Sequence, residues 1–394
     1  MVKSIKNNES NLFNLLLYDL YGLTEDEWSA IKKYKETKPL TDLSDISNHQ
    51  DINIKSYCDN NITVHKNFSY KNFEKMLRKN KKIKIIYVVV VSFHRQTSKI
   101  YTILKKINPY TVFFNWGETP EGGISYKKKS FIEKISMIKN NQLPFKGSLL
   151  NLFGLLYCKY LKVFDKIKIH DIYFNAGNYA NVPPKAKKII NINLCDYDQF
   201  ISNKNIDKSS ENSTVFIDSN LVSNSDIKLN GLKQINKERY LSSLNRFFDM
   251  FEKKYNTNII ISAHPTSEYN TDQFNGRKIY RLKTAELISN AKYVLSHHST
   301  AVSYAVLNYK PIIFLTINDW EGEYEDYAIK EFSKSLKSSF INIDNIKSND
   351  DIEINCVVKN IYDQYKYNFV VSKESEGLQS SKIILNEFNA FYAR

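Results

Sequence analysis

Two pairs of residues in the second half of the chain could hold a phosphate group. His264-Pro265 follows the β-branched apolar run 258–263, and Ser299-Thr300 comes shortly after a second apolar run, 293–295. Proline ends strand pairing, so we expect the first run to be a strand that delivers His264 to a sheet edge. Residues 301–307 have apolar side chains at helical spacing, which places Ser299 and Thr300 at a helix N-terminus, where free N–H groups attract anions. We interpret this region as a nucleotide-phosphate pocket in which the imidazole contacts the phosphate or protonates a leaving oxygen.

Two consecutive histidines, His297 and His298, precede the Ser-Thr pair. Consecutive residues that leave a strand point to opposite sides, so we expect one of them to be structural. We assign His298 to the pocket. Lys310, just before a proline, could steer a phosphate or could be one of many solvated lysines.

Carboxylates at other strand ends are candidates for acid–base chemistry. The strand expected at 110–116 ends in a glycine-rich turn that holds Glu118 and Glu121, either of which could act as a general base towards an acceptor hydroxyl. The alternative is that glycine, proline and acids simply make an exposed loop. Asp218 ends the strand expected at 214–217, where it could orient a sugar, accept a proton, act as a nucleophile or cap the following loop.

The elements that must position these residues alternate between strands and helices along both halves of the chain. This alternation predicts an α/β protein with parallel sheets, whose ligands bind beyond the carboxyl ends of the strands. Residues 203–213 have the composition of a linker, so we expect an N-terminal domain at 1–212 and a C-terminal domain at 213–374. A last helix within 375–394 could cross back to the first domain. Residues 11–21 are expected to be helical.

Composition and charge describe an ordered globular protein with a basic surface. Of the 394 residues 42% are hydrophobic and 13% aromatic, and the net charge is +14. This charge fits an anionic partner, namely nucleic acid, a membrane leaflet or phosphorylated and acidic sugars, or it serves general solubility. The four cysteines are far apart, no secretory signal is visible, and the longest apolar runs are about half of the ~20 residues that span a bilayer. We therefore expect a cytoplasmic protein, soluble or peripheral on the membrane.

Several standard nucleotide and hydrolase motifs are missing from the sequence. It contains no GxxxxGK[ST], no GxGxxG after a strand, no GxSxG and no HExxH, which argues against P-loop ATPases, dinucleotide enzymes and common hydrolases. Asp196-Tyr197-Asp198 is a DxD triplet that could hold a metal-bridged diphosphate, but we favour a plain turn there. No metal or other cofactor is expected.

At these motifs the chain resembles bacterial two-domain (GT-B) glycosyltransferases that use CMP-activated acidic sugars, including bacterial sialyltransferases and enzymes that transfer Kdo or other nonulosonic acids. It is also similar to surface-carbohydrate biosynthesis proteins that share five short motifs in a fixed order. The resemblance spans roughly residues 170–316. The motifs in this chain are Ala176-Gly177, Asp196-Tyr197-Asp198, Phe216-Ile217-Asp218, His264-Pro265 and His297-His298-Ser299-Thr300-Ala301.

The resemblance implies a GT-B-like fold of two Rossmann-like domains with a cleft between them. It implies that His264 and the Ser299-Thr300 pair hold the CMP phosphate, and that a carboxylate of the first domain activates the acceptor. The sialyltransferase-like motif is an adjacent acid pair followed by glycine, whereas this chain has Pro120-Glu121-Gly122. Because the first acid is absent, Glu118 stays a candidate beside Glu121.

The predicted activity is the metal-independent transfer of a nonulosonic acid (sialic, pseudaminic or legionaminic type) from a CMP-sugar to a bacterial surface glycan, an O-antigen or capsule. The partners are then the donor and an oligosaccharide or lipid-linked acceptor at the inner membrane. A close alternative is a CMP-Kdo transferase or a CDP-alditol phosphotransferase. An alternative of another class is a non-catalytic glycan- or nucleic-acid-binding protein, but no basic stripe with stacking aromatics is visible, so we expect no nucleic-acid partner.

Overall fold

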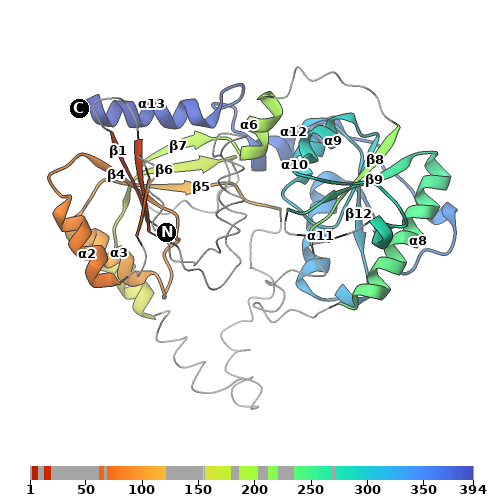
Figure 1. The fold of residues 1–394 in the computed structure, drawn as a ribbon, viewed down its shortest axis with the longest axis horizontal. Helices are drawn as coiled ribbons and strands as arrows, with labels where there is room; N and C mark the ends of the chain where they lie inside the picture. The colour runs from red at the N-terminus through yellow and green to blue at the C-terminus, as the bar shows by residue number, and fades with distance from the viewer. Residues whose placement is uncertain are drawn as a thin grey trace, which may run out of the picture.

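The fold is that of a computed structural model, which describes residues 2–7, 13–18, 62–65, 69–120, 154, 156–178, 186–202, 212–220, 235–265, 267, 269 and 271–393. Two α/β domains lie side by side, each built on one sheet (Figure 1). The expected fold class, α/β with two Rossmann-like domains, is confirmed. No helix in the described ranges is both long and apolar enough to cross a bilayer.

The first domain contains a seven-stranded sheet in the order β3-β2-β1-β4-β5-β6-β7. Strand β1 is antiparallel to β2 and β4, while the other pairs are parallel. The strands are β1 (Val2–Asn7), β2 (Phe13–Tyr18), β3 (Ile62–His65), β4 (Ile85–Val89), β5 (Thr111–Asn115), β6 (His170–Ala176) and β7 (Ala186–Ile192).

Strand β2 corrects the prediction of a helix over residues 11–21. The run is too short and too uniformly apolar for its periodicity to separate helix from strand. Pairing with β1, which itself pairs with β4 some 80 residues along the chain, decides the outcome.

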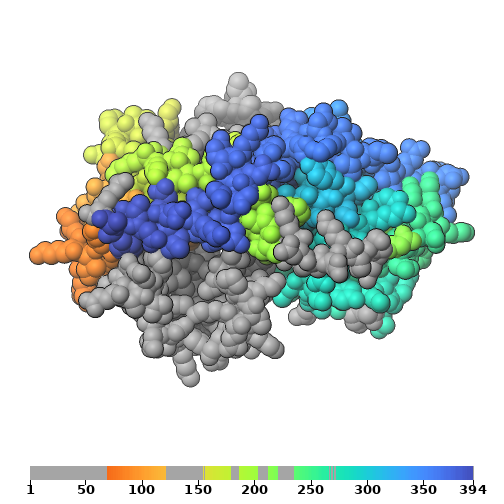
Figure 2. Space-filling view, turned by 90° about the horizontal axis from the view of Figure 1, so that it is seen from above, coloured from red at the N-terminus to blue at the C-terminus, as the bar shows by residue number. Residues whose placement is uncertain are grey.

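Helices cover both faces of the first sheet because its central strand alternates side chains between them. Tyr87 and Val89 of β4 pack under α2 (Tyr70–Lys79) and α3 (Ser98–Ile107). Ile86 and Val88 face the other side, where they share a core with Phe388 of the C-terminal helix α13 (Ser380–Ala393). This helix runs back across the first domain, as Figure 2 shows in dark blue. An ion pair between Lys188 and Glu387 (2.7 Å) ties α13 to β7.

The second domain contains a six-stranded sheet in which every pair is parallel, in the order β10-β9-β8-β11-β12-β13. Counted from β8, this is the order 3-2-1-4-5-6 of a doubly wound nucleotide-binding sheet. The order reverses between β8 and β11, so the crevice beyond their carboxyl ends is the expected ligand position. The strands are β8 (Ser213–Ile217), β9 (Asn258–Ala263), β10 (Ile279–Arg281), β11 (Tyr293–Ser296), β12 (Ile312–Thr316) and β13 (Ser339–Asn342).

The helices of the second domain bury apolar stripes against this sheet. Helix α8, for example, directs Leu244, Phe247, Phe248 and Phe251 into the core, as the spacing of these residues predicts. The helical elements are α8 (Lys237–Tyr255), η2 (Thr271–Phe274), α9 (Thr284–Asn290), α10 (Val302–Leu307), η3 (Asn318–Trp320), α11 (Tyr324–Leu336), η4 (Asn349–Asp351), α12 (Lys359–Tyr365) and the π-helical turn η5 (Lys366–Val370).

Helix α6 (Cys195–Ser202) packs with the second domain, although the sequence placed it in the first. Tyr197 of α6 belongs to the second core, and the hydroxyl of Tyr304 on α10 donates to Gln199 at 2.7 Å. Most of the expected linker at 203–213 lies outside the described residues, and it comes after this crossing in the chain. The chain enters the second domain at α6, before the expected boundary at 212.

Candidate functional site

Loops from β8 and β11 meet at the point where the strand order of the second sheet reverses. The hydroxyl of Ser219, two residues beyond β8, donates to the backbone carbonyl of His298, two residues beyond β11, at 2.9 Å. This bond holds together two of the polar loops singled out in the sequence. The site is therefore centred on the carboxyl edge of the sheet, as its order requires.

Asp218 organises the polar loops at the ends of β8 and β9. The residue is buried, and its carboxylate accepts hydrogen bonds from the backbone N–H of His264 (3.1 Å), the backbone N–H of Asn220 (3.0 Å), the hydroxyl of Ser267 (2.6 Å) and the hydroxyl of Tyr269 (3.4 Å). Both carboxylate oxygens are thus engaged within the protein. The geometry favours the capping role among the predicted alternatives and argues against Asp218 as a nucleophile.

His264 and Pro265 follow β9 at the same sheet edge, and the His264 ring is half-buried. The Asp218 carboxylate fixes the backbone of His264. Strand β8 lies between β9 and β11, so the loop of His264 and the loop of Ser299 and Thr300 are about 10 Å apart by ordinary strand spacing.

The two consecutive histidines have different surroundings. His297 is fully buried, its Nε2 lies 2.7 Å from the hydroxyl of Tyr240, and its Nδ1 lies 2.8 Å from the carbonyl oxygen of Leu315. His297 is therefore the structural residue of the pair. His298 is half-buried and faces Tyr324 edge-on at 6.2 Å, and burial lowers its pKa to about 4, so the free protein holds it neutral at pH 7.

The helix expected after Ser299 and Thr300 is present as α10, but its first N–H groups are not free. They are used inside the chain: Val302 donates to Ser299 O, Ser303 to Thr300 O and Tyr304 to Ala301 O. These donors are not free to bind a phosphate, so the predicted helix N-terminal anion site is wrong in that respect. The Ser299 hydroxyl accepts from the Ala301 N–H at 3.2 Å, whereas Thr300 is exposed.

A small pocket of about 40 Å³, partly open to solvent, lies where the two domains meet. It brings Glu118, beyond the end of β5, to the same cavity as Thr300 of the second domain. Its other lining residues come from the β5 loop, from the residue before α6, from α10 and from the C-terminal segment: Trp116, Gly117, Thr119, Leu194, Ser303, Tyr365, Phe369 and Val370.

Of the predicted site residues, Glu118 and Thr300 are the two that line this cavity. His264, His298 and Ser299 lie on the same sheet edge without lining it. Glu121 lies outside the described residues.

The negative charge of Glu118 affects the pKa of a neighbouring tyrosine. Burial raises the pKa of the Tyr173 hydroxyl to about 12, and the negative charge of Glu118 adds to the effect. Glu118 itself is half-buried, so a substrate hydroxyl in the pocket could reach it. A carboxylate in this position can serve as a general base.

Lys310 is at the opposite end of the sheet, which corrects its assignment to the phosphate site. It precedes β12, whose amino end lies a full strand length away from the carboxyl edge. Its carbonyl oxygen accepts a hydrogen bond from the Tyr362 hydroxyl at 3.0 Å. Lys310 is near Ser299 and Thr300 in the sequence, but α10 carries the chain back across the sheet between them.

The Asp-Tyr-Asp triplet forms the first turn of α6, and its carboxylates bond to the protein. Asp196 accepts from the hydroxyl of Ser303, which joins α6 to α10. Asp198 accepts from the side chain of Asn193 (3.1 Å) and from the backbone N–H of Ser380 (3.0 Å). The triplet is therefore helical, where a plain turn was expected, and it joins three segments of the chain.

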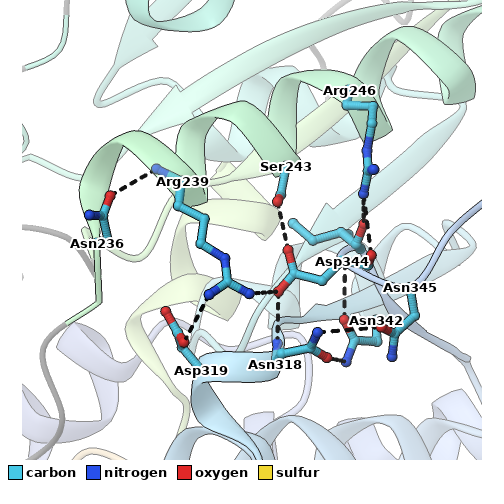
Figure 3. A network of polar contacts seen from close by, with 10 residues as sticks. Asn236, Arg239, Ser243, Arg246, Asn318, Asp319, Asn342, Asp344 and Asn345 are labelled. Atoms are coloured by element: carbon cyan, nitrogen blue, oxygen red, sulfur yellow. Dashed lines mark hydrogen bonds and ion pairs between the residues drawn. The ribbon is translucent and has the colours of Figure 1, made fainter.

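Polar residues beyond β12 and β13 form a separate network that closes that part of the sheet edge (Figure 3). Asp344 accepts from the hydroxyl of Ser243 (2.6 Å) and from the backbone N–H of Asn318 (2.9 Å), and Arg239 lies 3.8 Å from it. Arg246 donates to the carbonyl oxygen of Ile343 at 2.9 Å. These residues bond to one another, so we assign this network to the stability of the domain.

Sequence reasoning missed the aromatic and C-terminal lining of the pocket. Trp116 directly precedes the predicted Gly117-Glu118 turn and stacks on Phe114 at 5.1 Å, so its place at a strand end was an available signal. Tyr365 and Phe369 come from α12 and η5, far along the chain. No local pattern links these two residues to β5 or to Thr300.

No family model matches the chain, and no curated protein matches it. Among solved structures it is similar to the UDP-GlcNAc 2-epimerase of Methanocaldococcus jannaschii in complex with UDP-GlcNAc and UDP (14% identity, 82% of this chain and 79% of that chain, TM-score 0.38). It is also similar to Os79 from O. sativa in complex with UDP (9% identity, 82% of each chain, TM-score 0.45) and to MurG of Acinetobacter baumannii (9% identity, 80% and 76%, TM-score 0.35). Similarities this low transfer no property of these proteins to this chain.

Proposed function

We propose that the protein is a glycosyltransferase that moves a nonulosonic acid from a CMP donor to a hydroxyl of a bacterial surface glycan, an O-antigen or capsule. The observation that carries the proposal is the pocket between the domains, in which Glu118 and Thr300 come from opposite sides. A donor at the switch point of the second sheet would place its sugar towards the first domain. An acceptor held by the first domain would meet it there.

The donor phosphate is proposed to lie against the loop of His298, Ser299 and Thr300, with His264 on the far side of β8. A CMP donor has a single phosphodiester, so the leaving group carries less charge than a nucleoside diphosphate. Hydroxyl and imidazole donors can stabilise that charge without a divalent ion. The first amides of α10 are already bonded, so they do not bind the phosphate. The hydroxyl of Thr300 is therefore proposed to be a main hydrogen-bond donor to the phosphate from this loop.

In the proposed reaction Glu118 acts as the general base. The acceptor hydroxyl loses its proton to Glu118 while its oxygen bonds to the anomeric carbon of the donor sugar. The bond between that carbon and the phosphate oxygen breaks, and CMP leaves with the electron pair. Glu121 stays the second candidate for the base, and Asp218 takes the role of holding the backbone of His264.

Donor binding by His264 provides the first test. We expect CMP to raise the melting temperature of the wild-type protein, and we expect His264→Ala to reduce that shift, since an imidazole contact to the phosphate is lost. His94→Ala is the matched control, because His94 is exposed on the first domain. An equal CMP shift in all three proteins would refute the role of His264.

Calorimetric titration with CMP, CDP and UDP then decides the donor class. The proposal requires CMP to bind most tightly, whereas preference for CDP would favour a CDP-alditol substrate. Preference for UDP would rule out both cytidylate donors. This result is independent of whether Glu118 is the base.

A further inference from the structure

A short helix in the first domain, residues 156–163, exposes large apolar side chains to solvent. It lies beside α3 in Figure 1, coloured yellow. Val163 is 68% exposed and Phe164, just after the helix, is 60% exposed. Leu156, Tyr157 and Tyr160 are also about half exposed or more. Exposed apolar residues are ordinary when they are scattered, but five within nine positions are typical of a contact surface.

These side chains form one continuous stripe. At about 100° of rotation per residue, Val163, Leu156, Tyr160 and Tyr157 cover about a third of the helix circumference. The rings of Tyr160 and Phe164 lie 4.8 Å apart, which continues the stripe past the end of the helix. The exposed residues Lys159, Lys162 and Lys166 follow along one side of it. We call these eight residues the apolar–lysine stripe.

The helix is fixed to the domain by its other side, so the stripe is presented outward. Leu161 is buried, at 4% exposure, on the side opposite to Val163 and Leu156. An ion pair between Lys105 of α3 and Asp165 (2.5 Å) holds the end of the helix. The backbone N–H of Lys168 then donates to the carbonyl oxygen of Tyr101 at 3.2 Å.

The neighbouring surface carries a strong positive charge. Residues 69–107, which contain α2 and α3, have eleven lysines and arginines and a single acid, Glu74. That acid is itself paired with Arg78 (2.7 Å) and Lys106 (3.0 Å). Both helices lie on the same side of the first sheet as the helix of residues 156–163 in Figure 1.

We propose that the apolar–lysine stripe docks the protein on the surface of a bilayer rich in anionic phospholipid. Leucine, valine and the aromatic rings would enter the interface between headgroups and acyl chains, while the lysines bind lipid phosphates. A second copy of the chain fits this surface less well, because two faces of the same charge would repel each other. Nucleic acid also fits less well. Leu156 and Val163 cannot stack on bases as aromatic rings do, so they would gain no favourable contact with it.

The test is sedimentation of the full-length protein with vesicles of phosphatidylcholine containing 30% phosphatidylglycerol. We expect binding to these vesicles, at least tenfold weaker binding to pure phosphatidylcholine, and weakening as salt is raised. The double variant Val163→Ser/Phe164→Ser should bind at least fivefold more weakly. Leu282→Ser is the matched control, because Leu282 is equally exposed (59%) but lies on the second domain, and it should bind as the wild type does.

Circular dichroism at 222 nm and the melting temperature show that each variant is folded. Vesicle binding that survives the double variant would overturn the proposal, as would failure of the wild type to bind anionic vesicles. Equal binding to heparin and to vesicles, unaffected by the double variant, would indicate a purely electrostatic surface and would also overturn it. None of these results depends on a donor sugar, so failure here leaves the proposed glycosyl transfer untouched.

Discussion

At the residue scale, the consecutive histidines His297 and His298 have different roles. His297 bonds to Tyr240 and Leu315 in the core, whereas His298 faces the loop edge where a ligand is proposed. The alternation of the chain predicts that the two differ. It cannot say which one faces inward, because that depends on which face α8 covers, and this is set by contacts distant in sequence.

The assignment of Glu118 as the base leads to a kinetic prediction. Glu118→Gln keeps the shape of the side chain but removes the proton acceptor, so kcat should fall by about 10²–10⁴-fold while CMP affinity stays within twofold. Glu321→Gln, at an exposed position of the second domain, is the control and should retain wild-type kcat. Glu118→Gln with unchanged kcat would transfer the role to Glu121.

Buried neutral histidines predict that the fold loses stability in mild acid. Burial lowers the pKa of His170 to about 4 from an ordinary value near 6.5, and the positive charge of Lys168 adds to the effect. The unfolded chain then binds the proton first, so the stability due to this residue is complete above pH 6.5 and decreases as pH falls towards 4. His170 should account for about 2–3 kcal/mol of that loss, given that a pKa difference of one unit is worth about 1.4 kcal/mol.

The variant His170→Phe isolates this contribution. Phenylalanine suits the ring cluster, since His170 already packs on Phe113 at 5.3 Å, and the Tyr101 hydroxyl keeps its bond to the carbonyl oxygen of Val91 at 2.8 Å. Urea unfolding at pH 7 and pH 4.5 should show a smaller decrease for the variant than for the wild type. Parallel decreases in the two proteins would contradict the lowered pKa of His170.

At the element scale, the strands and helices of the second sheet were predictable and some functional details were not. The β-branched runs that became β9, β11 and β12 end at proline or at polar clusters, which local chemistry explains. The spacing of apolar residues predicted α10 correctly, but it does not show how the first amides of the helix are bonded. It misread residues 11–21 because only pairing with β1 makes that run a strand.

The π-helical turn η5 shows how closely the C-terminal segment approaches the first domain. Gly177, after β6, has a φ of +72°, and a Cβ atom there would lie 2.7 Å from the carbonyl oxygen of Asn368. The N–H of Asn178 donates to the carbonyl oxygens of Tyr367 (3.1 Å) and Asn368 (3.0 Å). Only glycine fits between these backbones. The glycine of the Ala-Gly motif therefore allows the first domain and η5 to pack closely.

Gly177→Ala should therefore destabilise the protein by on the order of 3 kcal/mol, because it combines an unfavourable φ with a backbone clash. Gly322→Ala is the matched control, with a φ of +76° and no heavy atom within 4 Å of the added Cβ, so only the conformational cost of about 1 kcal/mol applies. Urea denaturation measures both. Equal losses in the two variants would show that η5 can move away at little cost.

At the scale of the whole molecule, the two domains meet so that a carboxylate of one shares a pocket with a hydroxyl of the other. Alternating strands and helices made the α/β class and the division into two domains predictable. The pocket itself was only partly predictable, because Tyr365 and Phe369 reach it through the C-terminal segment, and such long-range packing leaves no local pattern. Lys310 was misplaced for a different reason. It precedes a strand, so strand polarity puts it at the opposite edge of the sheet from residues that follow a strand.

A crystal structure of the protein with CMP bound tests the central claim most directly. The account predicts that the phosphate lies beyond the carboxyl ends of β8 and β11, within hydrogen-bond distance of the Thr300 hydroxyl, on the side of the cavity that faces Glu118. CMP bound at any other part of the second domain, with Thr300 more than one water molecule away, would contradict it.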